Sequence, residues 1–425
     1  MRPRPDIRIP DSLSMPDMEE QTLANGARLF VLRADAYEVA RVSFVFRAGS
    51  LLQEHPFVAG ATANLLAEGS TRMTGRAISE QLDFYGSYFE VNLDRDFVYV
   101  SFCSLTRYFD RTLEVAGEIL LRPAFPETEV ETYRRKRQQL LAVERQKVDV
   151  LAREAFAGAM FGDRHPYGIA YPESAYDGLT REQLVAHYDR CYRGGNCIVV
   201  CSGRIGAAER AAVAALAGSL PAGTVPQPEL PERQADAFRR IVRADAVQSS
   251  IRTGRLLFPK PHPDFTGMQV VATLLGGYFG SRLMQNLRER HGYTYGVTAV
   301  TVNFDRAGYL AIGTQVGAGV TDAALAEIRR EVARLRTEPV PDDELTLVKR
   351  FMTGEMMRIL DGPFGIADVA IENILSGEAP EAVARTLNEI RATTPERIRQ
   401  LALRYLDEAD FVTVVAGPQP AGSEL

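Results

Sequence analysis

Apolar and polar residues alternate along several short stretches of the chain, which is the pattern of half-buried strands. In the first half these stretches are residues 29–33, 41–46, 88–93 and 97–102. Elsewhere in this half apolar residues recur every three or four positions, as on one face of a helix. This spacing predicts helices at residues 58–66, 76–85, 105–121 and 127–160.

The second half repeats this order. Alternation predicts strands at residues 249–257, 295–302 and 309–316. Helical spacing predicts helices at residues 266–275, 282–290, 322–335 and 342–359. Consecutive strands followed by helices indicate the α+β class, with an antiparallel sheet packed against helices in each half.

Two internal matches support a duplication. The segment from Thr180 to Gly203 has the same length as the segment from Thr394 to Gly417, and each reads as a helix followed by a buried strand. Both begin with a hydroxyl residue that can cap a helix N-terminus. Residues 81–91 also resemble residues 286–297, with one inserted residue. We therefore predict two homologous domains.

The segment between the two halves is rich in proline. Residues 221–232 contain four prolines and little periodicity, which is typical of a linker. We place an N-terminal domain at residues 1–220, a linker at 221–236 and a C-terminal domain at 237–425.

Composition excludes several classes of function. A net charge of -6 gives no support for nucleic-acid binding, and the basic run 134–137 is interpreted as a solvated helix face. The four cysteines contain no Cys-x-x-Cys pair, and Cys197 and Cys201 fall in an apolar strand. The first residues do not read as a signal peptide, and the apolar runs are too short to cross a bilayer. We expect a cytoplasmic protein, or a periplasmic one if a leader has been removed.

The candidate chemistry lies in the second half. A glycine-rich segment from Leu275 to Leu283 leads into Leu287-Arg288-Glu289-Arg290-His291-Gly292-Tyr293-Thr294-Tyr295-Gly296-Val297. With these motifs, the whole chain resembles the pitrilysin/insulinase-type metallopeptidases, also called inverzincins, and within them the bacterial and mitochondrial processing-peptidase branch. The resemblance implies two α+β domains that form half of a clam shell around a chamber.

Active members of that family carry His-x-x-Glu-His on an early helix, where two histidines bind zinc and the glutamate activates water. The flanking segments Ala48-Gly49-Ser50 and Glu68-Gly69-Ser70 locate this helix, and the motif positions then fall on Gly60, Ala63 and Asn64. None of these is a good zinc ligand. Glu144 lies near the position of the distant third ligand, and none of the five histidines has a partner at ligand spacing. We predict no catalytic zinc in this chain.

In the family, an arginine and a tyrosine seven residues apart face the zinc from the opposite half. Arg288 and Tyr295 have this separation. The resemblance assigns the arginine to substrate carbonyls and the tyrosine to the oxyanion. Tyr293 is a second candidate for the tyrosine. Gly276, Gly277, Gly280 and Ser281 correspond to the glycine-rich loop and are expected to contact substrate.

A chain with the Arg/Tyr pair and without the metal motif resembles the metal-free subunit of a two-subunit zinc peptidase. It would be inactive alone, and it would act with a homologous partner that brings His-x-x-Glu-His, zinc and the water-activating base. Its substrates would be peptides or unfolded proteins. Two alternatives remain open: a structural protein of the same fold, as in respiratory-complex core subunits, and a peptide-binding module that acts alone.

Overall fold

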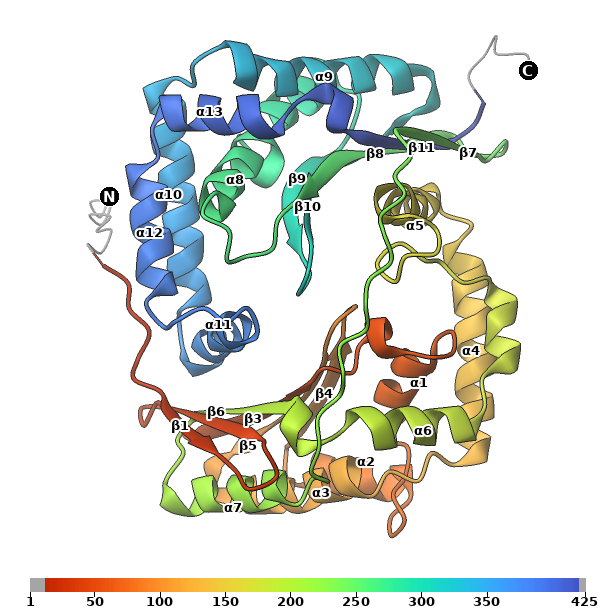
Figure 1. Cartoon of the computed structure of the whole chain (residues 1–425), viewed down its shortest axis with the longest axis vertical. Helices are drawn as coiled ribbons and strands as arrows, with labels where there is room; N and C mark the ends of the chain where they lie inside the picture. The colour runs from red at the N-terminus through yellow and green to blue at the C-terminus, as the bar shows by residue number, and fades with distance from the viewer. Residues whose placement is uncertain (1–11, 420–425) are drawn as a thin grey trace, which may run out of the picture.

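The computed structural model describes residues 12–419, which form two β-sheets with helices around them (Figure 1). The first sheet has six strands in the order β1-β2-β6-β3-β5-β4. Their bounds are β1 (Glu19–Thr22), β2 (Arg28–Arg33), β3 (Val39–Phe46), β4 (Tyr88–Leu93), β5 (Val98–Leu105) and β6 (Cys197–Gly203). The second sheet has five strands in the order β7-β11-β8-β10-β9. Their bounds are β7 (Phe238–Val242), β8 (Gln248–Leu257), β9 (Val297–Asn303), β10 (Gly308–Gly317) and β11 (Val412–Gly417).

The two sheets have the same topology once β1 is set aside. β2 pairs with β6 in parallel, and β7 pairs with β11 in parallel. All the other neighbours in both sheets are antiparallel. The α+β class with two helix-packed sheets is confirmed. Each sheet is mixed, because its last strand returns after a long helical crossover and can therefore lie parallel to an earlier one.

The helices of the first half are α1 (Val58–Asn64), α2 (Gly75–Phe84), α3 (Phe109–Leu121), α4 (Glu127–Glu144), α5 (Val148–Phe161), α6 (Arg181–Cys191) and α7 (Ala207–Gly218). Those of the second are α8 (Phe265–Ala272), α9 (Thr321–Thr337), α10 (Asp342–Ile359), α11 (Pro363–Leu375), α12 (Ala382–Ala392) and α13 (Pro395–Tyr405). Two π-helical segments, η5 (Thr273–Gly277) and η6 (Met284–Arg290), follow α8. The side chains of Thr180 and Thr394 cap α6 and α13, as the internal match predicts.

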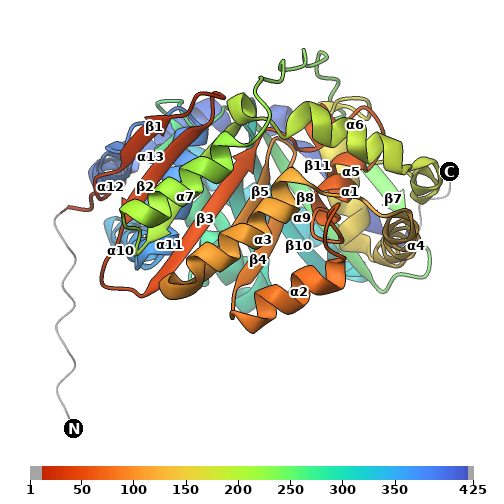
Figure 2. The ribbon, with the colours of Figure 1, turned by 90° about the horizontal axis from the view of Figure 1, so that it is seen from below.

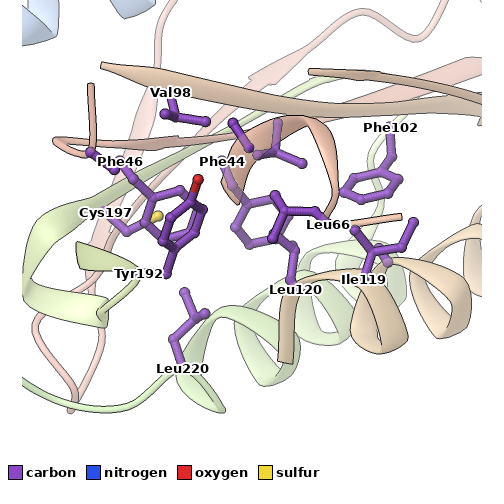
Figure 3. Close-up of a cluster of buried hydrophobic side chains, with 14 of the residues drawn as sticks. Phe44, Phe46, Leu66, Val98, Phe102, Ile119, Leu120, Tyr192, Cys197 and Leu220 are labelled. Atoms are coloured by element: carbon purple, nitrogen blue, oxygen red, sulfur yellow. The ribbon is translucent and has the colours of Figure 1, made fainter. Parts of the chain in front are cut away.

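The main core of the first half lies on the helix-covered face of its sheet. Along β5 buried and half-buried positions alternate, as expected for a strand with one face in the core. Helices α3 and α7 cover the outside of this sheet (Figure 2). The Phe44 and Phe102 rings meet edge to face, and Phe46 packs on Tyr192 near Cys197 (Figure 3). Cys197 and Cys201 are buried free thiols, which confirms their interpretation as core residues.

The sequence predicts one helix over residues 127–160, and this is wrong. Residues 145–147 interrupt it, and α5 turns away to pack on β7, β8 and β11 of the second sheet (Figure 1). Val148, Ala152 and Phe156 share a buried cluster with Val412 and Val414 of β11. Periodicity alone missed the break because the residues on both sides of it are good helix formers.

The second half makes the reciprocal contact through α11, which the sequence analysis did not predict. Ala367, Ala370 and Ile371 pack on Phe30 and Val200 of the first sheet. Each half therefore lends one helix to the sheet of the other. The division at residues 221–236, a segment without helix or strand, stays a prediction, because the cores on its two sides are joined.

A polar contact also ties the halves together. The buried Asp96 carboxylate accepts hydrogen bonds from the Tyr167 hydroxyl at 2.7 Å and from the Asp305 amide at 2.9 Å. Asp305 in turn forms an ion pair with Arg47. Burial raises the pKa of Asp96, and these two hydrogen bonds oppose the shift. Between residues 12 and 419, no helix has the length and apolar character needed to span a membrane.

Candidate functional site

The degenerate metal motif lies on α1. Ala63 is fully buried, and the exposed Asn64 donates its side-chain amide to the Gly60 carbonyl at 2.7 Å. A Cβ atom at position 60 would lie 3.8 Å from both the Leu93 side chain and the Tyr133 hydroxyl, which is ordinary van der Waals contact, so a small side chain would fit there. Gly60 and Ala63 have no donor atom and the Asn64 amide is engaged, so these residues do not fit a zinc ion.

Helix α4 faces α1 with residues that are not metal ligands. Tyr133, Arg137 and Leu141 recur every four positions and point to the same space as Gly60. Burial raises the pKa of Tyr133 to about 12, and its interactions with Arg137 and Asn64 oppose the shift. Glu144, the candidate third ligand, is not among the residues that line this space. Within residues 12–419, no group of three or more His, Cys, Asp or Glu side chains could hold a metal ion.

The space beside α1 is part of a cavity of about 580 Å³ between the two halves, which we call the inter-half cavity. The first half contributes residues of α1, α4 and α5, and the second half contributes β8, β9 and β10. Its charged side chains are Glu154 and the arginines Arg95, Arg137, Arg145, Arg153 and Arg252. The metal-motif positions Gly60 and Asn64 on α1 therefore border a cavity whose charged side chains are mainly positive.

The entrance to α1 is held in a strained conformation. Phe57, the residue before the helix, has a φ of 64°, which is unusual for a bulky side chain. Its ring stacks on Tyr176 with centroids 3.9 Å apart, and both rings line the inter-half cavity. Such strain persists only where the surroundings fix it. Here the stacking of Phe57 on Tyr176 fixes the strained backbone.

The glycine-rich loop follows α8. Gly276 and Ser281 are buried, and a Cβ atom at position 276 would lie 2.5 Å from the Ala299 amide nitrogen of β9. At position 280 it would lie 2.8 Å from the Tyr278 ring, and at position 277 it would meet Thr273. These glycines therefore allow close packing of η5 and the following turn. Their role toward substrate stays a prediction.

Arg288 and Tyr295 flank the turn that leads into β9. The Arg288 guanidinium lies over the Phe279 ring, 4.6 Å from its centroid, and Phe279 is 64% exposed. Tyr295 is 93% exposed, although it was predicted to begin a strand, and β9 starts only at Val297. Tyr293, the other candidate, packs against the second core and stacks on His291.

The turn that carries Tyr295 is ordered by its neighbours. The Thr294 hydroxyl donates to the Gln315 carbonyl at 2.7 Å, and the Gly296 amide donates to the Thr294 hydroxyl at 3.1 Å. Thr314 donates to the Gly296 carbonyl at 2.9 Å. Tyr295 is thus presented to solvent by a fixed backbone.

Gly60 and Asn64, at two of the metal-motif positions, and Tyr295 line neighbouring cavities. Tyr295 lines a cavity of about 360 Å³ on β8 and β10, and Arg252 lines both this cavity and the inter-half cavity. Arg288 lines neither. The structure therefore does not bring Arg288 and Tyr295 to the residues at the metal-motif positions of this same chain.

Residues 178–352 match the family model described as the peptidase M16 inactive domain. The crystal structure of a peptidase M16 inactive domain from Pseudomonas fluorescens has 22% identity and a TM-score of 0.88, covering 96% of this chain and all of that one.

Curated relatives match along most of the chain. An uncharacterized zinc protease, YmxG, of Bacillus subtilis is 20% identical over 94% of this chain and 98% of its own length. A probable mitochondrial-processing peptidase subunit beta of Arabidopsis thaliana is 21% identical over 96% of this chain and 79% of its own. The non-peptidase homolog YmxG of Helicobacter pylori is 21% identical over 74% of each chain.

Along most of its length the chain is similar to proteins of the peptidase M16 family, and these matches support an inactive member of that family. Its matches to an inactive domain and to a non-peptidase homolog agree with the missing ligands at Gly60 and Ala63, and it is a non-catalytic M16-like protein. The M16 resemblance inferred from the motifs is confirmed. What the M16 comparison does not assign is the role of Arg288, Tyr295 and the glycine-rich loop.

The arginines of the inter-half cavity were not predicted from the sequence. The basic run 134–137 was interpreted as one solvated helix face, and Arg134 and Arg135 do form ion pairs with Glu131. Arg137 points instead into the cavity. The four-residue spacing of Tyr133, Arg137, Leu141 and Arg145 was the available signal, because it places them on one helix face.

Proposed function

We propose that this chain is the metal-free subunit of a heteromeric zinc peptidase, in which Arg288 and Tyr295 act on substrate bound at the zinc site of a partner chain. The observation that carries the proposal is the exposure of Tyr295 on an ordered turn. A tyrosine hydroxyl with this much solvent access is free to enter another chain's active site. The relation to a mitochondrial-processing peptidase subunit beta supports a partnered arrangement.

The chemistry assigned to this chain needs only hydrogen-bond donors. When water attacks the scissile carbonyl at the partner's zinc, negative charge develops on the carbonyl oxygen, and the Tyr295 hydroxyl donates to it. The Arg288 guanidinium presents several fixed donors to neighbouring substrate carbonyls. The Phe279 ring holds this guanidinium by a cation–π contact, which limits its freedom before substrate binds.

Substrate is proposed to bind as an extended peptide. Each sheet ends in an edge strand with one free side, β4 beside α1 in the first half and β9 after the Tyr295 turn in the second. Such edges accept an added strand through backbone hydrogen bonds. Enclosure between subunits would exclude water and strengthen the hydrogen bonds that form there.

The test is peptide hydrolysis by this chain mixed with the zinc-bearing M16 chain of the same organism. Tyr295→Phe removes one hydroxyl and is expected to lower kcat about 100-fold, while subunit affinity stays the same. Arg288→Ala is expected to raise KM as well. Tyr37→Phe is the matched control, because Tyr37 is also exposed and lies in the loop between β2 and β3, outside both proposed edge strands. Unchanged hydrolysis by both Tyr295→Phe and Arg288→Ala would refute the assigned roles.

A further inference from the structure

The inter-half cavity has more positive charge than its own acids can neutralise. Five arginines line it, and Glu154 is the one acidic residue among its lining residues. Arg145 uses this carboxylate, with its Nε atom 2.9 Å from Glu154, and also pairs with Glu173 at 3.1 Å. The only acid in the lining is therefore already engaged.

The other four arginines have no such partner. Arg95, Arg137, Arg153 and Arg252 form no ion pair with any carboxylate within residues 12–419. Arg95 and Arg252 are half-buried, and burial lowers the pKa of both side chains. The nearby charge of Arg153 lowers the pKa of Arg252 further. Carboxylates at longer range attract three of these arginines: Asp96 and Glu154 act on Arg95, Glu144 on Arg137 and Asp149 on Arg252. Partly desolvated cations that no carboxylate contacts are still costly, and an anionic ligand would lower that cost.

Of the four arginines, Arg252 has the side chain whose position is most closely constrained by its neighbours. Its Nε atom is buried and has no hydrogen-bond partner. It stands opposite Gly313 in the pairing of β8 with β10, and a Cβ atom at position 313 would lie 2.6 Å from its Nη1 atom. Glycine at this strand position lets the guanidinium lie across β10. The sheet thus holds an arginine with an unused donor at the boundary of two cavities.

Apolar side chains also line this cavity, together with a few polar ones such as Gln53 and Asn64. Phe57, Phe156, Ile169 and Val300 provide apolar surface between the arginines. Arg137 and Arg153 are exposed, so a ligand in solvent can reach the guanidinium groups. We propose that the inter-half cavity binds an extended acidic peptide. The carboxylates of the peptide contact Arg137, Arg153 and Arg252, and its apolar side chains pack against Phe57 and Phe156.

This proposal rests on the proposed function, since it names the class of peptide that the subunit would select. An arginine fork binds a carboxylate through two parallel hydrogen bonds, and each pair is stronger where water is partly excluded. Apolar surface between the cations favours a peptide over a small anion, because a small anion gains nothing from it. A free phosphate and a peptide carboxylate share the same oxyanion chemistry, and the experiment separates them.

The experiment measures binding to the whole chain by fluorescence anisotropy, without any partner. The probe is a labelled peptide of Glu, Leu and Ala, compared with the same peptide in which every Glu is replaced by Gln. The Glu peptide is expected to bind at least about tenfold more tightly, and added salt should narrow the difference. Equal affinity of the two peptides would overturn the proposal.

Variants locate the site. Arg252→Gln is expected to weaken the Glu peptide about tenfold and to leave the Gln peptide unchanged. Arg137→Gln, on an accessible helix face, should act in the same direction and keeps the test valid if Arg252→Gln does not fold. Arg350→Gln is the matched control, since Arg350 lies on α10, is exposed and is outside the cavity. A loss of binding in Arg350→Gln equal to that in Arg252→Gln would contradict the site.

Inorganic phosphate provides the last arm. It should not displace the Glu peptide beyond what chloride does at equal ionic strength. Specific displacement by phosphate would make this a free-anion site and sink the proposal. The outcome is independent of Arg288 and Tyr295, because no hydrolysis is measured. Failure of their variants in the reconstituted enzyme would leave this binding result in place, and the reverse also holds.

Discussion

At the scale of single residues, packing and exposure fall on different positions of the glycine-rich region: some residues are buried in the core and others are exposed to solvent. Gly276 lies so close to the Ala299 backbone that no side chain fits, whereas Tyr295 and Phe279 extend into solvent a few residues away. An exposed polar aromatic side chain contributes little to folding. The buried glycine therefore fixes the η5 segment against β9, and the exposed residues remain available for binding.

Gly276→Ala tests this separation. The added methyl group would lie 2.5 Å from the Ala299 amide nitrogen, so β9 or η5 must shift, and we expect a loss of about 1–3 kcal/mol in the free energy of unfolding. Gly354→Ala is the control, because no atom lies within 4 Å of its Cβ position in the middle of α10. It should gain up to about 1 kcal/mol from helix propensity. Urea unfolding of both variants measures the difference, and a neutral Gly276→Ala would remove the packing role.

At the scale of elements, helix α6 secures the chain that leads into α1. His187 on α6 is buried and its Nε2 atom lies 3.1 Å from the Ala48 carbonyl oxygen, just before the degenerate motif helix. Burial lowers the pKa of His187 from 6.5 to about 4. The neutral ring with hydrogen on Nε2 can donate to this carbonyl. His187 is thus a structural hydrogen-bond donor, and no ligand partner is needed to explain it.

This contact makes stability depend on pH. Because the folded-state pKa is depressed to about 4, the unfolded chain binds more protons between about pH 4 and 6.5. The stabilisation is therefore fully present above about pH 6.5 and is lost as the pH falls toward 4, by roughly 3 kcal/mol. His187→Gln should flatten this part of the profile, measured as the urea midpoint at pH 5 against pH 7. Parallel profiles for the two proteins would contradict the assignment.

The sequence was sufficient for most of the strands and for the helix caps, since alternation and capping are local properties. It did not predict β1 and β7, two edge strands with no buried residue and therefore no alternation of buried and exposed positions. Thr180 and Thr394 cap their helices as expected, and Gly86 and Gly292 both have positive φ in the turns before β4 and β9. It did not predict the break after Glu144, because what ends α4 there is the packing of α5 on the distant second sheet. Local propensity carries no information about that contact.

The candidate site, too, could be predicted from the sequence only in part. The loss of donor atoms at Gly60 and Ala63 is visible in the sequence, because a ligand position is recognised by its residue type. The inter-half cavity was not visible, since Arg137, Arg153 and Arg252 come from three elements far apart in the chain. Only the fold brings these guanidinium groups to one space.

At the scale of the whole molecule, the exchange of α5 and α11 joins the two halves into one body (Figure 1). The inter-half cavity lies between them. The buried Asp96 adds a polar contact between them. Such shared cores resist independent opening, because separating the halves would expose apolar surface on both sheets. The chain therefore exposes Tyr295 to solvent and encloses the arginine-lined cavity between its halves.

The division of chemistry between two chains is the central claim, and one assay tests it most directly. Peptide hydrolysis and zinc content are measured for the purified chain alone, for the zinc-bearing M16 chain alone and for their mixture, each with and without a chelator. We expect no hydrolysis and no stoichiometric zinc for this chain alone, and a chelator-sensitive activity that requires the mixture. Chelator-sensitive hydrolysis by this chain alone would contradict that division.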